Sequence, residues 1–240
     1  MSWDLSELKK NVQKSYGSEQ SSKLTPCLNS IVERQEFSRY HYHQAKDTFE
    51  KALHDKTDSE SLIDLVLMKN SKEGEEFEES KFITRANILS CIQNIHSVSD
   101  ILSHVIYYSL DLKNAKNEYQ ISLSNVFKWI EQEEQYKSLA GFIESLIEHK
   151  DYKYLSAIVN HSKHRSIVEA YFNVNLRKQG KDMQEIKFRE FVFRKKSYSS
   201  RHAFEFLTKE FDRESELVVK IGNKLNEMAL KNANKALKRN

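Results

Sequence analysis

Residues 82–110, which read FITRANILSCIQNIHSVSDILSHVIYYSL, decide the fold. Between Arg85 and Asp111 the only formal charge is Asp100. One face of a helix through this stretch carries regularly spaced apolar residues, namely Ile88, Ile92, Ile95, Leu102 and Ile106. Uncharged polar residues lie on both sides of this apolar seam. The stretch therefore predicts a central helix that is buried nearly all round, with a polar arc facing a cleft or a subunit interface.

The composition favours long helices around this central one. The chain has 240 residues with only 5 glycines and 1 proline, and both residue types are poor in helix interiors. Apolar residues at helical spacing predict further helices over 25–54, 59–68, 124–150 (one or two helices), from about 152 into the 160s, and 200–237. The first of these begins at Thr25-Pro26, because threonine is a good N-cap and proline suits the first turn. Residues 1–24 are predicted to be a polar N-terminal arm, either loose or with one short helix, and Asn70–Ser80 a solvated loop.

The period of the pattern changes at 168–176, which read VEAYFNVNL. Alternate positions there are apolar, as in a half-buried strand. A turn containing Gly180 follows, and Ile186, Phe188 and Val192 alternate on a return strand. We therefore expect a β-hairpin at about 166–194, inserted before the C-terminal helix. The fold is predicted to be mainly all-α, a bundle of six or seven helices forming a single domain over 25–240.

The net charge does not identify a partner, but the motifs that the sequence lacks exclude several classes of enzyme. There are 38 basic and 35 acidic side chains, so the net charge of +3 does not by itself demand a nucleic-acid partner. Phosphate-binding glycine-rich loops, zinc-type Cys/His spacings and serine nucleophile elbows are absent from the sequence, so no cofactor and no metal site is expected. The N-terminus lacks a secretory signal, and no window reaches the roughly 18 apolar residues of a membrane span. We expect a cytoplasmic protein with no membrane partner.

A polar cluster at 159–165, VNHSKHR, carries the candidate chemistry. On a helix Asn160 and His164 share a face. Histidine titrates at a pKa of about 6.5 and can exchange a proton at neutral pH, while an amide can orient the reacting group, so these two residues are the candidate catalytic pair. His161, Lys163 and Arg165 are candidate substrate-binding residues, because positive charge attracts a phosphodiester. The alternative is a helix C-terminus at which these groups satisfy free carbonyls.

This cluster in a helical chain resembles the HEPN superfamily, whose motif is arginine, a polar residue that is often asparagine, three further residues, and histidine. Asn160 and His164 fit that frame, and Val159 stands where the family has arginine. The resemblance covers about residues 25–165. It implies metal-independent cleavage of RNA by a homodimer whose two motifs meet across the interface. Arg165 can supply the missing charge from another position, or the site binds RNA without cleaving it.

A second polar group lies on the central helix, where His96, Asp100 and His104 are spaced by four. Three interpretations are open. The stripe could hold a divalent metal, it could form ordinary buried hydrogen bonds, or it could pack against residues 160–165, with Asp100 fixing the tautomer of an imidazole. We expect the third interpretation, in which His96, Asp100 and His104 are supporting residues around the catalytic pair.

The resemblance thus implies a HEPN-like cytoplasmic protein of a toxin or phage-defence type that acts on RNA, as an endoribonuclease or as an RNA-binding protein. In the first case His164 is the general acid or base and Asn160 orients it. The alternative is a non-catalytic homodimeric scaffold in which the polar cluster is structural.

Overall fold

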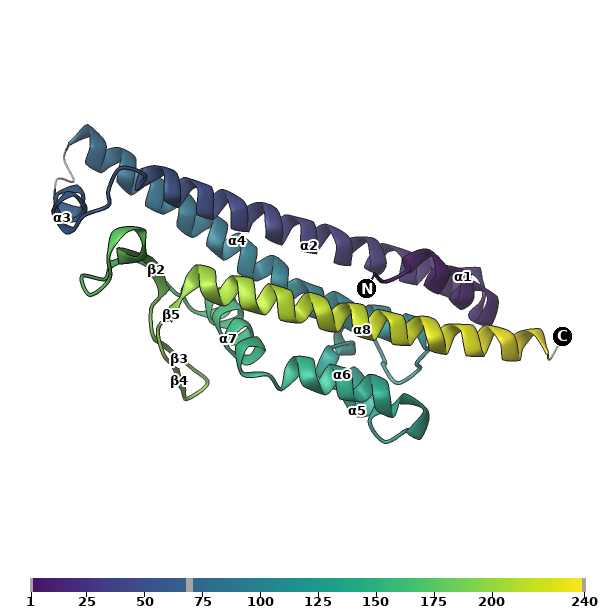
Figure 1. Cartoon of the computed structure of the whole chain (residues 1–240). Helices are drawn as coiled ribbons and strands as arrows, with labels where there is room; N and C mark the ends of the chain where they lie inside the picture. The colour runs from purple at the N-terminus through teal and green to yellow at the C-terminus, as the bar shows by residue number, and fades with distance from the viewer. Residues whose placement is uncertain (1, 68–70, 239–240) are drawn as a thin grey trace. The chain divides into compact units, whose positions relative to one another are not determined.

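The computed structural model describes residues 2–67 and 71–238, and within these ranges the fold is mainly α-helical (Figure 1). The helices are α1 (Leu5–Tyr16), α2 (Ser18–Ala52), α3 (Ser59–Leu67), α4 (Lys72–Ser109), α5 (Leu123–Ile130), α6 (Lys137–Ile147), α7 (Lys150–His164) and α8 (Ala203–Leu237). The strands are β1 (Ala170–Val174), β2 (Gln184–Phe188), β3 (Phe191–Phe193), β4 (Lys196–Tyr198) and β5 (Arg201–His202). The predicted all-α class, with a β-hairpin before the last helix, is confirmed.

Contacts divide the chain into two compact units. One, here called the helical unit, comprises residues 1–35, 95–153 and 210–240, and the other, the mixed unit, comprises 36–94 and 154–209. The boundaries fall inside α2, α4, α7 and α8. The prediction of one domain over 25–240 stays a prediction.

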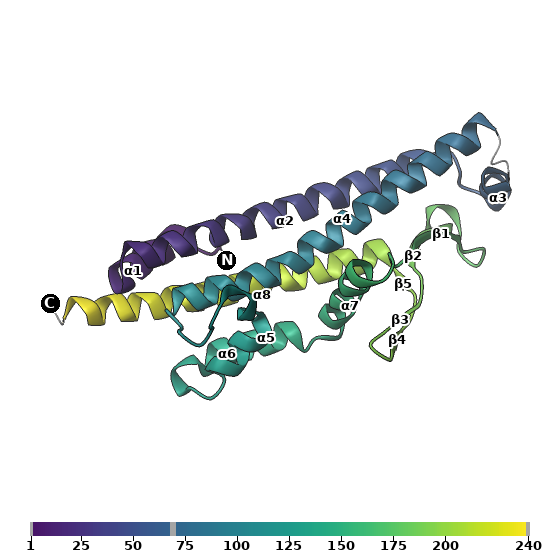
Figure 2. The same ribbon diagram turned by 180° about the vertical axis from the view of Figure 1, so that it is seen from behind.

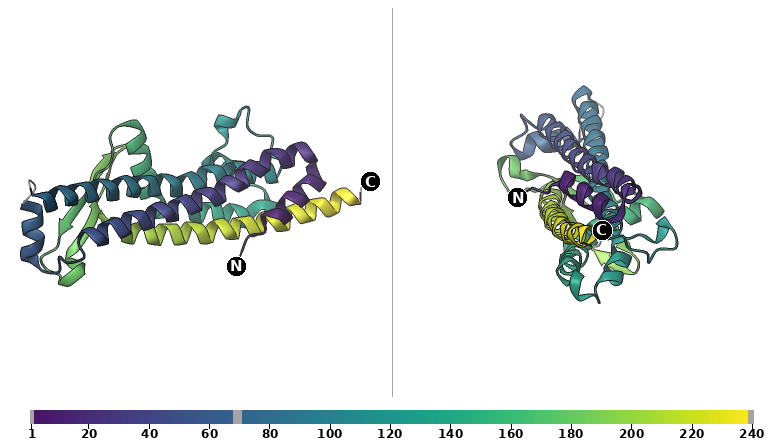
Figure 3. Two further views of the ribbon diagram at one scale, coloured as in Figure 1. Left: turned by 90° about the horizontal axis from the view of Figure 1, so that it is seen from above. Right: turned by 90° about the vertical axis from the view of Figure 1, so that its right-hand side faces the viewer.

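In the helical unit the N-terminal segment is part of the core. It forms α1, which is capped by Asp4 accepting a hydrogen bond from the Glu7 backbone N–H, and Leu8 and Val12 on this helix are fully buried. Gly17, at a φ of 90°, turns the chain into α2, so that α1 doubles back beside the start of α2 (Figure 3). Of the two forms predicted for residues 1–24, a loose arm or one short helix, the structure shows a short packed helix, and the beginning of α2 follows it.

The prediction that a helix begins at Thr25-Pro26 is wrong, because α2 begins at Ser18 and runs through both residues. Leu24, Leu28 and Ile31 are buried in one core cluster, so the apolar face already starts before the proline. Burial of these side chains outweighs the loss of one backbone hydrogen bond at Pro26. The helix ends at Ala52, close to the predicted position.

The predicted loop at Asn70–Ser80 is also wrong over 72–80, which form the first turns of α4; Asn70 lies outside the described residues. Ser71 caps this start, since its hydroxyl oxygen accepts from the Gly74 N–H at 3.1 Å. Glutamates in a first turn interact favourably with the helix dipole, and Phe77 is buried. The acidic composition therefore marks a helix N-terminus. Downstream, the apolar positions of the predicted central helix are buried as expected.

The mixed unit contains a sheet with strand order β1-β2-β5 and a separate two-stranded ribbon of β3 and β4 (Figures 1 and 2). In the predicted hairpin, Phe172 pairs with Ile186 and Ala170 with Phe188, antiparallel. The return strand ends at Phe188, so Val192 belongs to the ribbon rather than to this hairpin. No helix in the described ranges is long and apolar enough to cross a membrane.

Candidate nucleic-acid interface

The polar cluster predicted from the sequence lies on the last turn of α7 and just beyond it. The Asn160 side-chain amide donates to the Ser156 carbonyl at 2.8 Å and to the Ser156 hydroxyl at 3.2 Å, so its N–H bonds are made within α7. His164 is exposed at the end of the helix, as are its neighbours Lys163 and Arg165. The end of α7 therefore presents one imidazole and two cations to solvent.

His161 is held in a defined orientation. Its Nδ1 lies 2.6 Å from the carbonyl oxygen of Ser166. A carbonyl oxygen only accepts, so Nδ1 donates and the neutral ring keeps a free lone pair on Nε2. The ring also packs edge-on against Phe191 and Phe193, at centroid distances of 5.5 and 6.2 Å. These contacts attach the end of α7 to the β3–β4 ribbon.

The ribbon itself is a tight hairpin that the sequence analysis missed. Phe191 pairs with Tyr198 and Phe193 with Lys196, which leaves Arg194 and Lys195 as a two-residue turn. Both turn residues have positive φ, 49° and 64°, as a type I′ turn requires. Such turns favour Asn-Gly, because glycine has no Cβ and asparagine tolerates positive φ, whereas most other residues in this conformation cost about 1 kcal/mol or more. The turn thus holds two exposed cations at an energetic cost.

Buried aromatic packing fixes the ribbon against α7. Tyr154 of α7 is 2% exposed, and its hydroxyl donates to the Ser199 carbonyl at 3.2 Å. Its ring packs edge-on against Phe191 and Tyr198, with centroids 5.8 and 5.9 Å apart. The guanidinium of Arg201 lies 4.2 Å from the same ring. Burial raises the pKa of the Tyr154 hydroxyl to about 12, so this anchor is neutral at physiological pH.

Cations and rings alternate over this region. The Arg165 and Arg194 guanidinium carbons lie 5.8 and 5.2 Å from the Phe193 ring centroid. Lys196 Nζ lies 5.3 Å from the Tyr198 ring. We call this region the basic–aromatic surface and define it by ten residues: His161, Lys163, His164, Arg165, Phe191, Phe193, Arg194, Lys195, Lys196 and Tyr198.

The charge on the basic–aromatic surface is uncompensated. Five of its members are exposed cations, namely Lys163, Arg165, Arg194, Lys195 and Lys196. None of them forms an ion pair with a carboxylate in the part of the chain that the structure describes. The nearby Glu169 is paired instead with Arg189, at 2.7 Å. Unpaired cations beside half-buried rings suit a ligand that carries both phosphates and flat bases.

The predicted supporting residues lie in the helical unit. His96 is buried, with Nδ1 3.4 Å from Asp100 Oδ2 and its ring stacked on Tyr152 at 6.1 Å. His104 packs against Tyr108, and burial lowers the pKa of its imidazole. Asp100 itself is largely exposed. Since residues 160–165 belong to the mixed unit, the packing of this stripe against them stays a prediction.

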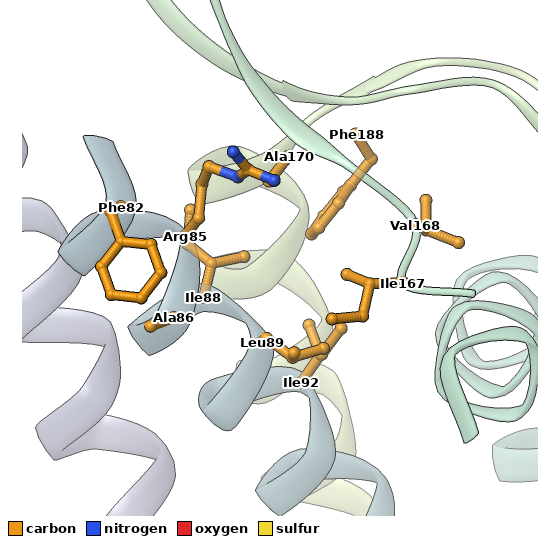
Figure 4. Close-up of a pocket in the computed structure, with 10 residues that line it drawn as sticks. All are labelled: Phe82, Arg85, Ala86, Ile88, Leu89, Ile92, Ile167, Val168, Ala170 and Phe188. Atoms are coloured by element: carbon orange, nitrogen blue, oxygen red, sulfur yellow. The ribbon is translucent and has the colours of Figure 1, made fainter. Parts of the chain in front are cut away.

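A cavity of about 210 Å³ lies elsewhere in the mixed unit, between α4 and the chain after α7 (Figure 4). Its lining is apolar except for Arg85 at the rim, and includes Ile88, Ile167 and Phe188. One cation without a partner acid or base cannot move a proton in a reaction cycle. The cavity therefore offers binding space, and the catalytic candidates lie on the exposed end of α7.

Comparisons with protein-family models, with characterised proteins and with solved structures found no match to this chain. The ribbon shows which signal was missed: residues 191–198, FVFRKKSY, alternate rings on either side of three consecutive cations. This interleaving of aromatic and basic residues is itself typical of nucleic-acid surfaces.

Proposed function

We propose that this protein binds single-stranded RNA through the basic–aromatic surface. The observation that carries the proposal is the set of five exposed, unpaired cations placed among aromatic rings. Phosphate groups would pair with the cations, and the release of counterions would supply much of the affinity. The net charge of the chain is only +3, so the attraction is local to this surface.

The aromatic members favour a single strand over a duplex. Phe191, Phe193 and Tyr198 are half-buried, which leaves part of each ring available to an unstacked base. A base in a duplex is already stacked on both faces, whereas an unpaired base can stack on a ring with a gain of about 1–3 kcal/mol. Recognition by stacking is also tolerant of sequence, so we expect weak preference among RNA sequences.

We further propose that His164 is the group that would cleave a bound strand. Its imidazole is exposed beside Lys163 and Arg165, so a phosphodiester held by these cations would come within its reach. This step rests on the HEPN resemblance, in which Val159 replaces the family arginine, and Arg165, next to His164 in sequence, is the cation that would stabilise the developing charge. The homodimer and the cytoplasmic location expected from the sequence stay predictions. Light scattering on the purified protein measures whether it is a dimer.

A salt titration tests the proposed binding. Fluorescence anisotropy of a labelled single-stranded RNA should give an affinity that falls with salt. Replacing Lys163, Arg165 and Lys196 with alanine should weaken binding at least about 10-fold and reduce the slope of log K against log salt by about 2. The matched control replaces Lys10, Lys14 and Lys116, three exposed lysines of the helical unit, and should leave both quantities unchanged. Equal losses in the two triple variants, or no RNA binding by the wild type, would favour the scaffold alternative.

A further inference from the structure

A second group of chemically active side chains lies in the helical unit. His149 precedes α7, Asp151 is in its first turn, and Glu210 is on α8. One ligand atom of each lies within 4.8 Å of the others. Around a bound ion with bonds of about 2.0–2.2 Å, ligand atoms stand about 3.0–3.5 Å apart. Small side-chain rotations would therefore bring these three atoms to coordinating distance.

The buried carboxylate of Glu214 is a second, independent observation that points to a cation-binding site. Glu214 lies one turn after Glu210 on the same face of α8 and is 2% exposed. Neither of its carboxylate oxygens has a hydrogen-bond partner among residues 2–67 and 71–238. A buried carboxylate without a partner is strongly destabilising unless something neutralises it. Burial, and then the neighbouring Glu210, raise the pKa of Glu214 well above its ordinary value.

The charge balance of the group points the same way. Arg213 pairs with Glu210 through two bonds, Nε to Oε2 at 2.8 Å and Nη2 to Oε1 at 2.6 Å. One guanidinium set against the carboxylates of Glu210 and Glu214 leaves one negative charge over on this face of α8. Each carboxylate oxygen has two lone pairs, so Glu210 can accept from Arg213 and still bind a cation.

His149 presents a lone pair toward this group. Its Nδ1 accepts a long hydrogen bond, 3.3 Å, from the Asp151 backbone N–H, and it lies 3.9 Å from Asp151 Oδ2. An acceptor nitrogen beside two carboxylates suits a borderline cation such as Zn²⁺, Mn²⁺ or Fe²⁺ better than Mg²⁺ or Ca²⁺, which prefer oxygen ligands. The 3.3 Å bond is weak, so a metal would displace it at little cost.

We infer that His149, Asp151 and Glu210 bind one divalent first-row transition-metal ion, with Glu214 as the carboxylate that balances its charge. The ion ties the start of α7 to α8 within the helical unit. It stabilises the folded chain because the ligands are brought together only in the native state. This site is separate from the basic–aromatic surface and does not depend on RNA binding.

Isothermal titration of the full-length, chelator-treated protein with Mn²⁺ and, separately, Zn²⁺ tests the inference. The wild type should bind one ion per chain, and the ion should raise its melting temperature. The variant H149A/D151N should bind at least about 10-fold more weakly and lose the ion-dependent rise in melting temperature. Because both residues are only half-buried, its melting temperature without metal should stay close to that of the wild type.

The chain offers a matched control in His54 and Asp55, an exposed histidine–aspartate pair with Nδ1 2.6 Å from Oδ1 and without buried glutamates. The variant H54A/D55N should bind metal like the wild type. Equal weakening in both double variants, unchanged binding by H149A/D151N, or no binding of either ion by the wild type below about 100 µM would overturn the inference. If the wild type binds neither ion, a proton rather than a metal neutralises Glu214.

Discussion

Phe191 and Tyr198 stack face to face across the β3–β4 ribbon, with ring centroids 4.9 Å apart and planes inclined by 8°. They form a directly opposed cross-strand pair, so the contact fixes the register of the ribbon and places two half-buried rings side by side in the basic–aromatic surface. In the proposed complex with RNA, this pair of rings, flanked by Arg194 and Lys196, is where an unstacked base would bind.

The first prediction concerns this stack. Tyr198→Phe keeps the ring and removes only the hydroxyl, so RNA affinity should change by less than about 3-fold. Tyr198→Ala removes the ring and should weaken binding by about 1–3 kcal/mol, which is the usual worth of one base stacked on an aromatic side chain. Fluorescence anisotropy measures both variants, and circular dichroism checks that each is folded. Equal affinities for the alanine and phenylalanine variants would exclude base stacking at this position.

A second prediction assigns the chemistry to His164. Because this side chain is exposed, His164→Ala should leave the melting temperature unchanged and abolish any cleavage of labelled RNA. The assay contains a chelator, since the proposed cleavage needs no metal, and His54→Ala serves as the exposed-histidine control. Cleavage that persists in His164→Ala would contradict the assignment.

The hairpin also allows a prediction about acid stability. Burial alone would raise the pKa of the Glu185 carboxyl, but hydrogen bonds from Lys187, Lys178 and Asn175 outweigh it and lower the pKa from 4.5 to about 2. A carboxyl whose pKa is lower in the folded than in the unfolded state stabilises the folded state at pH values above the unfolded pKa. This contribution is lost as the pH falls from 4.5 toward 2. The contribution of this carboxylate to the free energy of unfolding is on the order of 3 kcal/mol.

Urea unfolding across this pH range measures the effect. The wild type should lose stability between pH 5 and about 2, and Glu185→Gln should be less stable at pH 7 and show a shallower loss over the same range. If the free energy of unfolding falls with pH equally in the wild type and in Glu185→Gln, Glu185 is not the cause of the acid sensitivity.

Two helical glycines, one in a crowded and one in an open position, allow a test of the packing around α8. A Cβ at Gly222 of α8 would overlap the indole ring of Trp3, whereas one at Gly141 of α6 would meet nothing within 4 Å. Gly222→Ala should therefore destabilise the protein by about 1–3 kcal/mol. Gly141→Ala should stabilise it by about 0.5–1 kcal/mol, because alanine is the better helix former. Thermal melts of the two variants that shift in the same direction would show that Trp3 does not pack on α8 as described.

The sequence predicted the elements whose hydrophobic period is long and regular. The central helix, the β1–β2 pairing and the last helix follow from the spacing of residues such as Ile88 and Phe172, because burial on one face selects the period. Local signals were less reliable. Pro26 suggested a helix start, and the glutamates before Ser80 suggested a loop, but buried Leu24 and Phe77 decide otherwise.

The candidate site was predicted only in part. Residues 160–165 were found because histidine and basic residues cluster in sequence, yet the ribbon that completes the surface was missed, since Arg194 and Lys195 are unusual turn residues. The group of His149, Asp151 and Glu210 could not be found from spacing either. It is assembled by packing between α8 and residues about 60 positions earlier in the chain.

The turn of the ribbon gives the most direct test of RNA binding. Replacing Arg194-Lys195 with Asn-Gly keeps a type I′ turn and removes two cations, so it separates fold from function. The account predicts a variant that is equally stable or about 1–2 kcal/mol more stable in urea, and whose RNA affinity, measured by fluorescence anisotropy, falls at least about 5-fold. An Asn-Gly variant that binds RNA as tightly as the wild type would contradict the central claim.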